Sequence, residues 1–188
     1  MKKKIYIYSL LCLFVSGALD AYTLLLRGGV FAAMQTGNLI YFCINLVKGN
    51  FSLLYKYVFS IIAFCLGIFA EHLIKRCRNG TKISVALIVI FYAAGFAIPY
   101  GKPDFVANML FSFAVAIQLQ LIRSIDSFVI ASTMCTGNLR SLVECVASLI
   151  TEKGERVKYK RGIVIYSTLI LAFMTGVAVV AALVHYLS

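Results

Sequence analysis

The sequence has few charged residues, few prolines and no tryptophan. Of its 188 residues, 13% are charged, only seven of these are acidic, and 62% are hydrophobic. A soluble domain is typically about 25% charged and about 45–50% apolar. The mean hydropathy of +0.93 is correspondingly high. This composition excludes an ordinary soluble protein and indicates an integral membrane protein.

The patterns of common catalytic and metal sites are also missing. The six cysteines form no Cys-x-x-Cys pair and most lie in apolar runs, so we expect free thiols rather than disulfides or a zinc site. The two histidines lie near segment ends and cannot build a usual metal site. We see no Ser-His-Asp arrangement and no glycine-rich phosphate loop, and therefore expect no enzyme activity, no cofactor and no metal.

The net charge of +11 has a simple explanation in a membrane protein. The lysines and arginines gather in short stretches between apolar segments, as the positive-inside rule describes. We expect their partners to be the anionic headgroups of the lipid bilayer rather than nucleic acid.

Seven apolar segments can be marked, at about 5–26, 30–47, 53–74, 83–99, 105–122, 128–150 and 162–187. A spanning helix needs roughly 20 apolar residues, and lipid favours helices because they satisfy their own backbone. We predict an all-α, polytopic helical membrane protein with one domain over residues 1–188. Three lysines at positions 2–4 place the N-terminus in the cytoplasm. Glu71, beside a basic loop, is expected at a solvated helix end.

A repeated tripeptide divides the chain into two halves. Thr36-Gly37-Asn38 and Thr136-Gly137-Asn138 lie 100 residues apart, each with Met two residues before and Leu directly after. The third and seventh segments share the pattern Ala-Phe-x-x-Gly, at 63–67 and 172–176. We infer two three-helix repeats, at about 5–75 and 104–187, joined by a linker helix at about 83–99. Such repeats recur in transporters, with substrate sites at their interface.

The relation between the repeats depends on the second and sixth segments. If all seven segments cross, the repeats are parallel, and 11 basic residues face the cytoplasm against six outside. If the Thr-Gly-Asn segments dip in and return, the repeats are inverted, and 13 face the cytoplasm against four. We expect seven crossings because each segment is long enough to span, although the charges favour the second arrangement.

Gly37 and Gly137 sit within these apolar segments and allow two interpretations. Small residues let helices pack closely. Alternatively, glycine breaks the helix, and the Thr and Asn side chains bind the freed backbone groups. Broken helices in transporters direct their ends at a substrate or ion.

Further polar residues lie inside apolar runs. Asp20 is either a buried proton or cation site or lies near the outer end of the first segment, and Gln120 has the same offset in the second repeat. Arg140 and Glu144 are spaced to pair on a helix. They form either a self-neutralised pair at the membrane edge or a cavity-facing arginine that contacts an anionic group or Asp20.

The N-terminal pattern resembles a known family. The residues 17–21 (GALDA), 29–31 (GVF) and 35–39 (QTGNL) resemble the signature of the YoaK family of bacterial membrane proteins of unknown function. Where the family tends to have Gly-x-Gln-Asn, this chain has AIQLQ at 116–120, with Gln118 as the matching glutamine. The resemblance implies a multi-pass protein of the bacterial cytoplasmic (inner) membrane with six or seven helices, and it implies no reaction.

We therefore expect a small secondary transporter or channel for a small polar or ionic solute, acting at the repeat interface, and a homo-oligomer. The alternative is a non-transporting membrane scaffold or assembly subunit in which the Thr-Gly-Asn motifs serve helix packing. The residues expected along the solute pathway are Asp20, Thr36, Gly37, Asn38, Gln118, Gln120, Thr136, Gly137, Asn138, Arg140 and Glu144.

Overall fold

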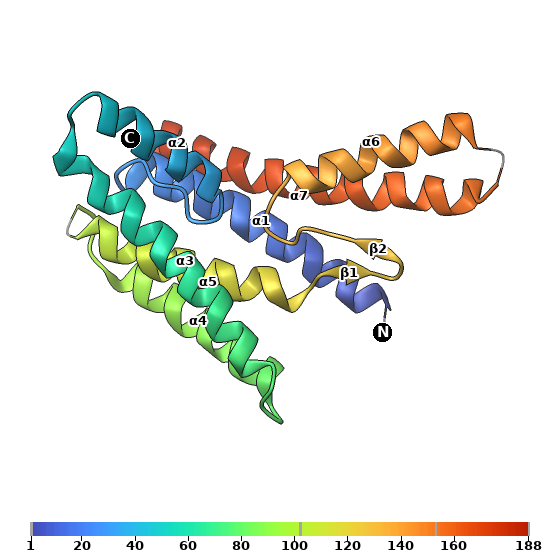
Figure 1. Cartoon of the computed structure of the whole chain (residues 1–188), viewed down its shortest axis with the longest axis horizontal. Helices are drawn as coiled ribbons and strands as arrows, with labels where there is room; N and C mark the ends of the chain where they lie inside the picture. The colour runs from blue at the N-terminus through green and yellow to red at the C-terminus, as the bar shows by residue number, and fades with distance from the viewer. Residues whose placement is uncertain (1, 102, 153, 188) are drawn as a thin grey trace.

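The computed structural model describes residues 2–101, 103–152 and 154–187, which form seven α-helices and one β-hairpin (Figure 1). Lys102 and Lys153, both counted above among the loop charges, lie outside the described residues. The helices are α1 (Lys2–Leu26), α2 (Gln35–Val47), α3 (Leu54–Ile74), α4 (Gly80–Ala97), α5 (Asp104–Leu121), α6 (Thr136–Thr151) and α7 (Arg156–Leu187). A 3₁₀ turn, η1 (Phe51–Leu53), precedes α3, and strands β1 (Ser124–Ile125) and β2 (Phe128–Val129) pair antiparallel before α6. The predicted all-α polytopic class is confirmed.

Five of the described helices, α1, α3, α4, α5 and α7, are long and apolar enough to cross a membrane. The remaining two, α2 and α6, contain 13 and 16 residues. At 1.5 Å per residue they reach only about 20 and 24 Å, less than the roughly 30 Å of the hydrocarbon core. Of the seven segments expected to cross, five of those described thus contain a helix of spanning length, because the second and sixth segments are helical over only part of their length.

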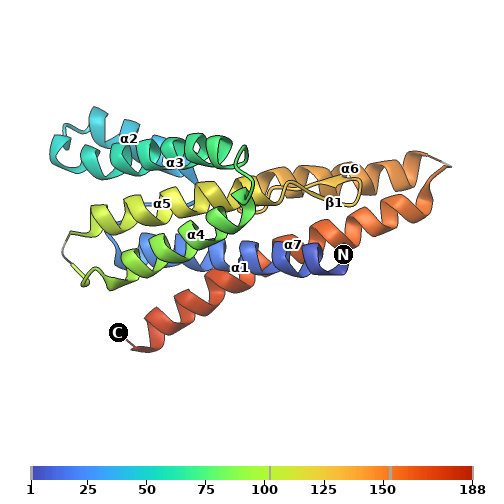
Figure 2. The ribbon, with the colours of Figure 1, turned by 90° about the horizontal axis from the view of Figure 1, so that it is seen from below.

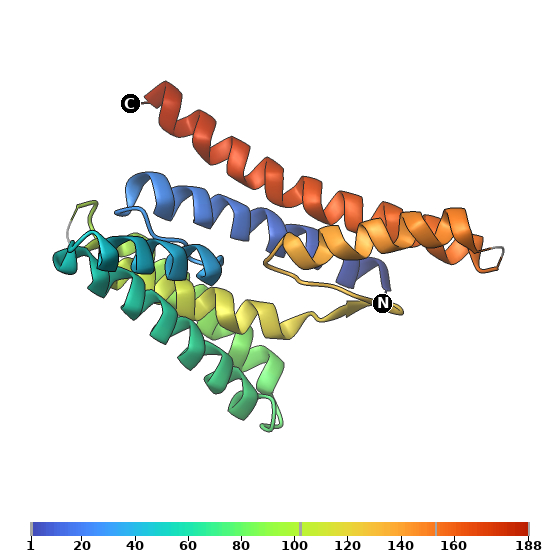
Figure 3. The same cartoon turned by 45° about the horizontal axis from the view of Figure 1, so that its top comes forward.

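Each of these two segments runs into the molecule as irregular chain and then runs back outward as a helix. Residues 27–34 run from the end of α1 back toward the middle of the molecule, and α2 returns from there (Figure 1). Residues 130–135 do the same from the opposite end, and α6 leads back out (Figures 1 and 3). Seen from below, α2 and the α6–α7 hairpin lie at opposite ends of the molecule (Figure 2).

The two reversals are built differently. After α1, Gly28 and Gly29 have φ angles of +80° and +73°, a region that is open to glycine and costly for other residues. After α5, the chain reverses through the β1–β2 hairpin, in which Asp126 has a φ of +53°. Residues with positive φ angles thus form the turns from which both inward segments begin.

Glycines bring the long helices into backbone contact across the two halves. A Cβ atom added to Gly176 of α7 would lie 2.0 Å from the carbonyl oxygen of Phe14 in α1. A Cβ added to Gly67 of α3 would lie 2.5 Å from the carbonyl oxygen of Phe113 in α5. These are the glycines of the two Ala-Phe-x-x-Gly patterns. Small residues at such positions allow the close approach that drives helix association in lipid.

The buried apolar side chains form two clusters. One surrounds Phe111 and joins α1, the first inward segment, α3 and α5. The other surrounds Leu13 and Leu169 and joins the N-terminal half of α1, the hairpin and α7. The tips of both inward segments lie at the first cluster, because Ala33 belongs to it and Met134 packs against it.

Candidate functional site

Each Thr-Gly-Asn asparagine closes its own inward segment. The Asn38 side chain accepts the Phe31 N–H at 2.9 Å and donates to the Phe31 carbonyl at 2.8 Å. Asn138 makes the same pair of bonds with Ala131, at 3.0 and 2.8 Å. Both asparagines are buried. We call each of these arrangements an asparagine brace, because one amide satisfies both backbone groups of a residue that no helix or strand pairs.

The first brace continues into a polar chain that crosses the helices. The Asn38 amide also donates to Gln35 Oε1 at 2.8 Å and to Ser60 Oγ of α3 at 3.3 Å. The Ser60 hydroxyl is 2.6 Å from that of Ser112 in α5. Side chains from both halves are therefore joined by hydrogen bonds inside the bundle.

Asp20 lies at the tip of the first inward segment. Its Oδ1 accepts the Ala33 N–H at 2.7 Å, and its side chain is buried. Cys135, directly before α6 at the tip of the second segment, lies within electrostatic range of Asp20. Met134 packs on the cluster that contains Ala33. Asp20 therefore lies inside the bundle and does not reach the headgroups at the outer end of its helix.

The matching positions of the second segment carry unsatisfied oxygens. Gln120 has the offset of Asp20, and Thr133 has the offset of Ala33. The Ser132 hydroxyl donates to the Leu119 carbonyl at 3.4 Å, so these stretches lie side by side. Gln120 Oε1 and Thr133 Oγ1 are buried and have no hydrogen-bond partner among the described residues. A buried oxygen left in this way is costly and can receive a donor or a cation.

Gln118, two residues before Gln120 in α5, joins three helices. Its amide nitrogen donates to the Cys12 carbonyl at 3.0 Å and to Ser16 Oγ at 3.1 Å in α1, and its oxygen accepts the Tyr92 hydroxyl of α4 at 2.9 Å. It is buried. The side chain therefore positions helices and has little capacity left for a solute.

The threonines and glycines of the two motifs lie in the first turns of α2 and α6, and not at a break within a helix as expected. Thr36 and Thr136 lie in the first turns of α2 and α6 with exposed side chains, so they do not line an interior. The helix break precedes the motif rather than coinciding with the glycine. Gly37 faces the Phe31 ring, 2.6 Å from an added Cβ, whereas Gly137 has room for one.

Arg140 and Glu144 form the predicted pair, at 2.8 Å. Their side chains are 81% and 59% exposed. They therefore lie on the outer surface of α6, and Arg140 contacts Glu144 rather than Asp20. Salt bridges so exposed contribute little to stability.

With this geometry described, comparison with known proteins places the chain. The family model described as "Protein of unknown function (DUF1275)" matches residues 8–188. The chain belongs to the DUF1275 family. The UPF0700 transmembrane protein YoaK of Bacillus subtilis (strain 168) is 25% identical over 183 residues, which are 92% of this chain and 80% of that protein. No solved structure matches the chain. The resemblance read from the N-terminal residues is confirmed.

In this DUF1275 protein, sequence reasoning missed the most extensively bonded charge, Arg27. It is 2% exposed and pairs with Asp104 at the start of α5, at 3.0 Å. It also donates to the Tyr22 hydroxyl at 2.8 Å and to the carbonyls of Ile98 and Pro99 at 2.8 and 3.1 Å. This arginine ties the ends of α1, α4 and α5 together. The signal in the sequence that could have indicated this ion pair was Asp104, a lone acid at the same end of the bundle.

Glu71 corrects a second expectation of the sequence reading. It is buried rather than solvated, and the Ser84 hydroxyl of α4 donates to it. Lys75, one turn further along, has its amino group 3.9 Å from the Glu71 carboxylate. The end of α3 is thus fastened to α4 by a buried carboxylate.

Proposed function

We propose that this protein is a small secondary transporter or channel for a small polar or ionic solute. The observation that carries the proposal is the pair of half-length helices, α2 and α6, which come from opposite ends. The residues just before them, Ala33 and Met134, pack in one cluster beside the buried Asp20. In transporters, broken helices of this kind present their ends to substrates and ions near the bilayer midplane. Buried ionisable residues in membrane proteins usually mark such pathways.

We further propose that the two halves are inverted repeats, α1–α3 and α5–α7, with α4 as the linker. Matching features support the duplication: the asparagine brace occurs in both halves, and the Ala-Phe-x-x-Gly glycine of each half meets the first helix of the other. Three crossing helices, α1, α3 and α4, separate the two starting points. An odd number of crossings makes the second half run in the opposite sense.

The charges support a bacterial cytoplasmic membrane with the N-terminus inside. In this arrangement 13 lysines and arginines fall on the N-terminal side and four on the other. The positive-inside rule places the richer side in the cytoplasm.

The pathway in this proposal involves oxygen acceptors rather than the exposed ends of the motifs. Asp20, Gln120 and Thr133 supply the carboxylate and the two unsatisfied oxygens near the tips. Such oxygen atoms can act as ligands of a cation or accept hydrogen bonds from the N–H groups of a solute. Asn38 and Asn138 act as positioning residues that hold the two tips.

A second candidate is a membrane scaffold or assembly subunit that moves no solute. It is favoured by the full use of the asparagine amides within the protein, since both side chains bond to their own segment. In that case the motifs serve the fold, and the tips need no access to water.

Water access at Cys135 separates the two candidates. All other cysteines are replaced by serine or alanine, and the reconstituted protein is treated from each side with a charged, membrane-impermeant thiol reagent. We expect modification of Cys135 from at least one side. A matched variant that keeps only Cys65, which lies on the outer surface of α3, should resist the reagent because lipid covers it. If Cys135 resists from both sides as Cys65 does, the transporter proposal is wrong and the scaffold is favoured.

A further inference from the structure

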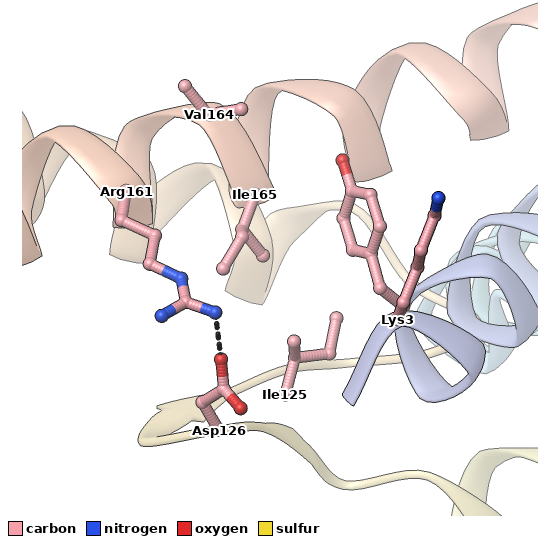
Figure 4. A pocket seen from close by; sticks show the side chains of 7 residues that line it. Lys3, Ile125, Asp126, Arg161, Val164 and Ile165 are labelled. Carbon is pink, nitrogen blue, oxygen red and sulfur yellow. Dashed lines mark hydrogen bonds and ion pairs between the residues drawn. The ribbon is translucent and has the colours of Figure 1, made fainter. Parts of the chain in front are cut away.

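A hollow of about 430 Å³ lies at the N-terminal end of the molecule, between α1, the β1–β2 hairpin and α7 (Figure 4). It shares no residue with the region around Asp20. Ile125, Val164 and Ile165 give it an apolar wall, and the ring of Tyr6 adds to this wall. The Tyr6 hydroxyl bonds to Thr168 at 2.7 Å and so fixes α1 against α7 beside the hollow.

The rim of the hollow is basic. Lys3 and Arg161 stand on opposite sides of it, from α1 and α7 (Figure 4). Arg161 forms an ion pair with Asp126 of the hairpin, which fixes the guanidinium beside the opening. A guanidinium carries five N–H donors, so some remain for an anion. With two cations and one carboxylate, the lining has a net positive charge.

The combination of an apolar wall and a basic rim fits an amphipathic anion. A free phosphate would interact with the two cations and leave the apolar wall uncovered. A phospholipid covers both surfaces, because its phosphate and its acyl chains are joined. The hollow also lies at the end with most of the basic residues, where a membrane protein meets anionic headgroups.

We propose that this hollow binds the phosphate of an anionic phospholipid headgroup. Lys3 and Arg161 donate to the phosphate oxygens, and Ile125, Val164 and Ile165 contact the upper part of the acyl chains. Charge-assisted bonds from arginine suit the planar arrangement of two phosphate oxygens. Binding here clamps the hairpin, which starts the second inward segment, to α1 and α7.

The test uses the full-length protein in neutral detergent, titrated with phosphatidylglycerol and, separately, with phosphatidylcholine, with bound lipid counted by native mass spectrometry. The variant K3Q/R161Q removes both rim charges. Its affinity for phosphatidylglycerol should fall about thirtyfold, because both charge-assisted bonds to the phosphate are lost. The control K4Q/K160Q removes the same charge from the same two helices, outside the hollow; it removes only screened attraction at a distance and should change the affinity less than about threefold.

The controls also show which results would overturn the proposed lipid site. Equal losses in the two double variants would mean diffuse attraction by the basic end and would overturn the site. Displacement of the lipid by glycerol phosphate at similar concentrations would mean a site for free anions and would overturn the lipid assignment. If the double variant fails to fold, K3Q can be compared with the parent protein instead, because K3Q keeps the Arg161–Asp126 pair. Unchanged phosphatidylglycerol affinity in K3Q would also contradict the proposal.

Discussion

Replacing the brace asparagines by alanine should destabilise the protein, and by different amounts in the two halves. In Asn138→Ala, the N–H and the carbonyl of Ala131 lose their bonds of 3.0 and 2.8 Å. In Asn38→Ala, the N–H of Phe31 loses its partner, but the Phe31 carbonyl keeps the Ser60 hydroxyl at 3.3 Å. Asn138→Ala also removes the bond of 2.9 Å to the Met134 carbonyl. The second half therefore loses the partner of three backbone groups and the first half that of one.

The cost follows from the number of orphaned groups. Each buried backbone group without a partner costs about 1–3 kcal/mol. We expect Asn38→Ala to lower the free energy of unfolding by about 1–3 kcal/mol and Asn138→Ala, with three groups affected, by about 3–9 kcal/mol. Thr36→Ala and Thr136→Ala, at exposed positions two residues earlier, should stay within about 0.5 kcal/mol of the parent protein.

The free energies can be measured by reversible unfolding in bicelles, with each asparagine variant compared with the threonine variant of the same motif. Asparagine variants as stable as the threonine variants would refute the brace. A larger loss for Asn38→Ala than for Asn138→Ala would contradict the role given to Ser60.

Three further predictions use the same assay. Gly17→Ala should destabilise by about 1–3 kcal/mol or more, since its Cβ would lie 2.2 Å from a carbonyl oxygen of α7; Gly137→Ala has room for its Cβ and should be neutral or stabilise by up to about 1 kcal/mol. Arg27→Gln should cost about 3–5 kcal/mol because it leaves a buried ion pair broken. The double variant Arg140→Ala/Glu144→Ala, at an exposed pair, should unfold at the same denaturant concentration as the parent protein.

The membrane class, the helix positions and the family could be predicted from the sequence, because they depend on hydrophobic runs and on local motifs. The repeated Thr-Gly-Asn also indicated the two segments that differ from ordinary spans. The exact break could not be predicted, since the helix starts depend on Asn38 and Asn138 reaching a residue seven positions earlier. Hydrophobicity alone made both segments look long enough to cross.

The candidate site was predicted only in part. Asp20 was singled out as an acid inside an apolar run, because such a residue is costly in lipid, and the structure buries its side chain. Arg140 and Glu144 were spaced correctly for a pair, but the side of α6 that faces outward could not be read from the sequence. Glu71 was assigned to a solvated end and Arg27 was missed, since the positions of their partners depend on how distant helices pack.

The central claim is that the two Thr-Gly-Asn segments return to the side from which they came. It is tested most directly by the side of the membrane on which the loop between α3 and α4 lies. In a variant with Cys77 as its only cysteine, labelling by an impermeant thiol reagent in sealed vesicles of known orientation can be compared with that of Lys4→Cys. We predict that both positions are labelled from the same side. Labelling of Cys77 from the side opposite to the N-terminus would contradict it.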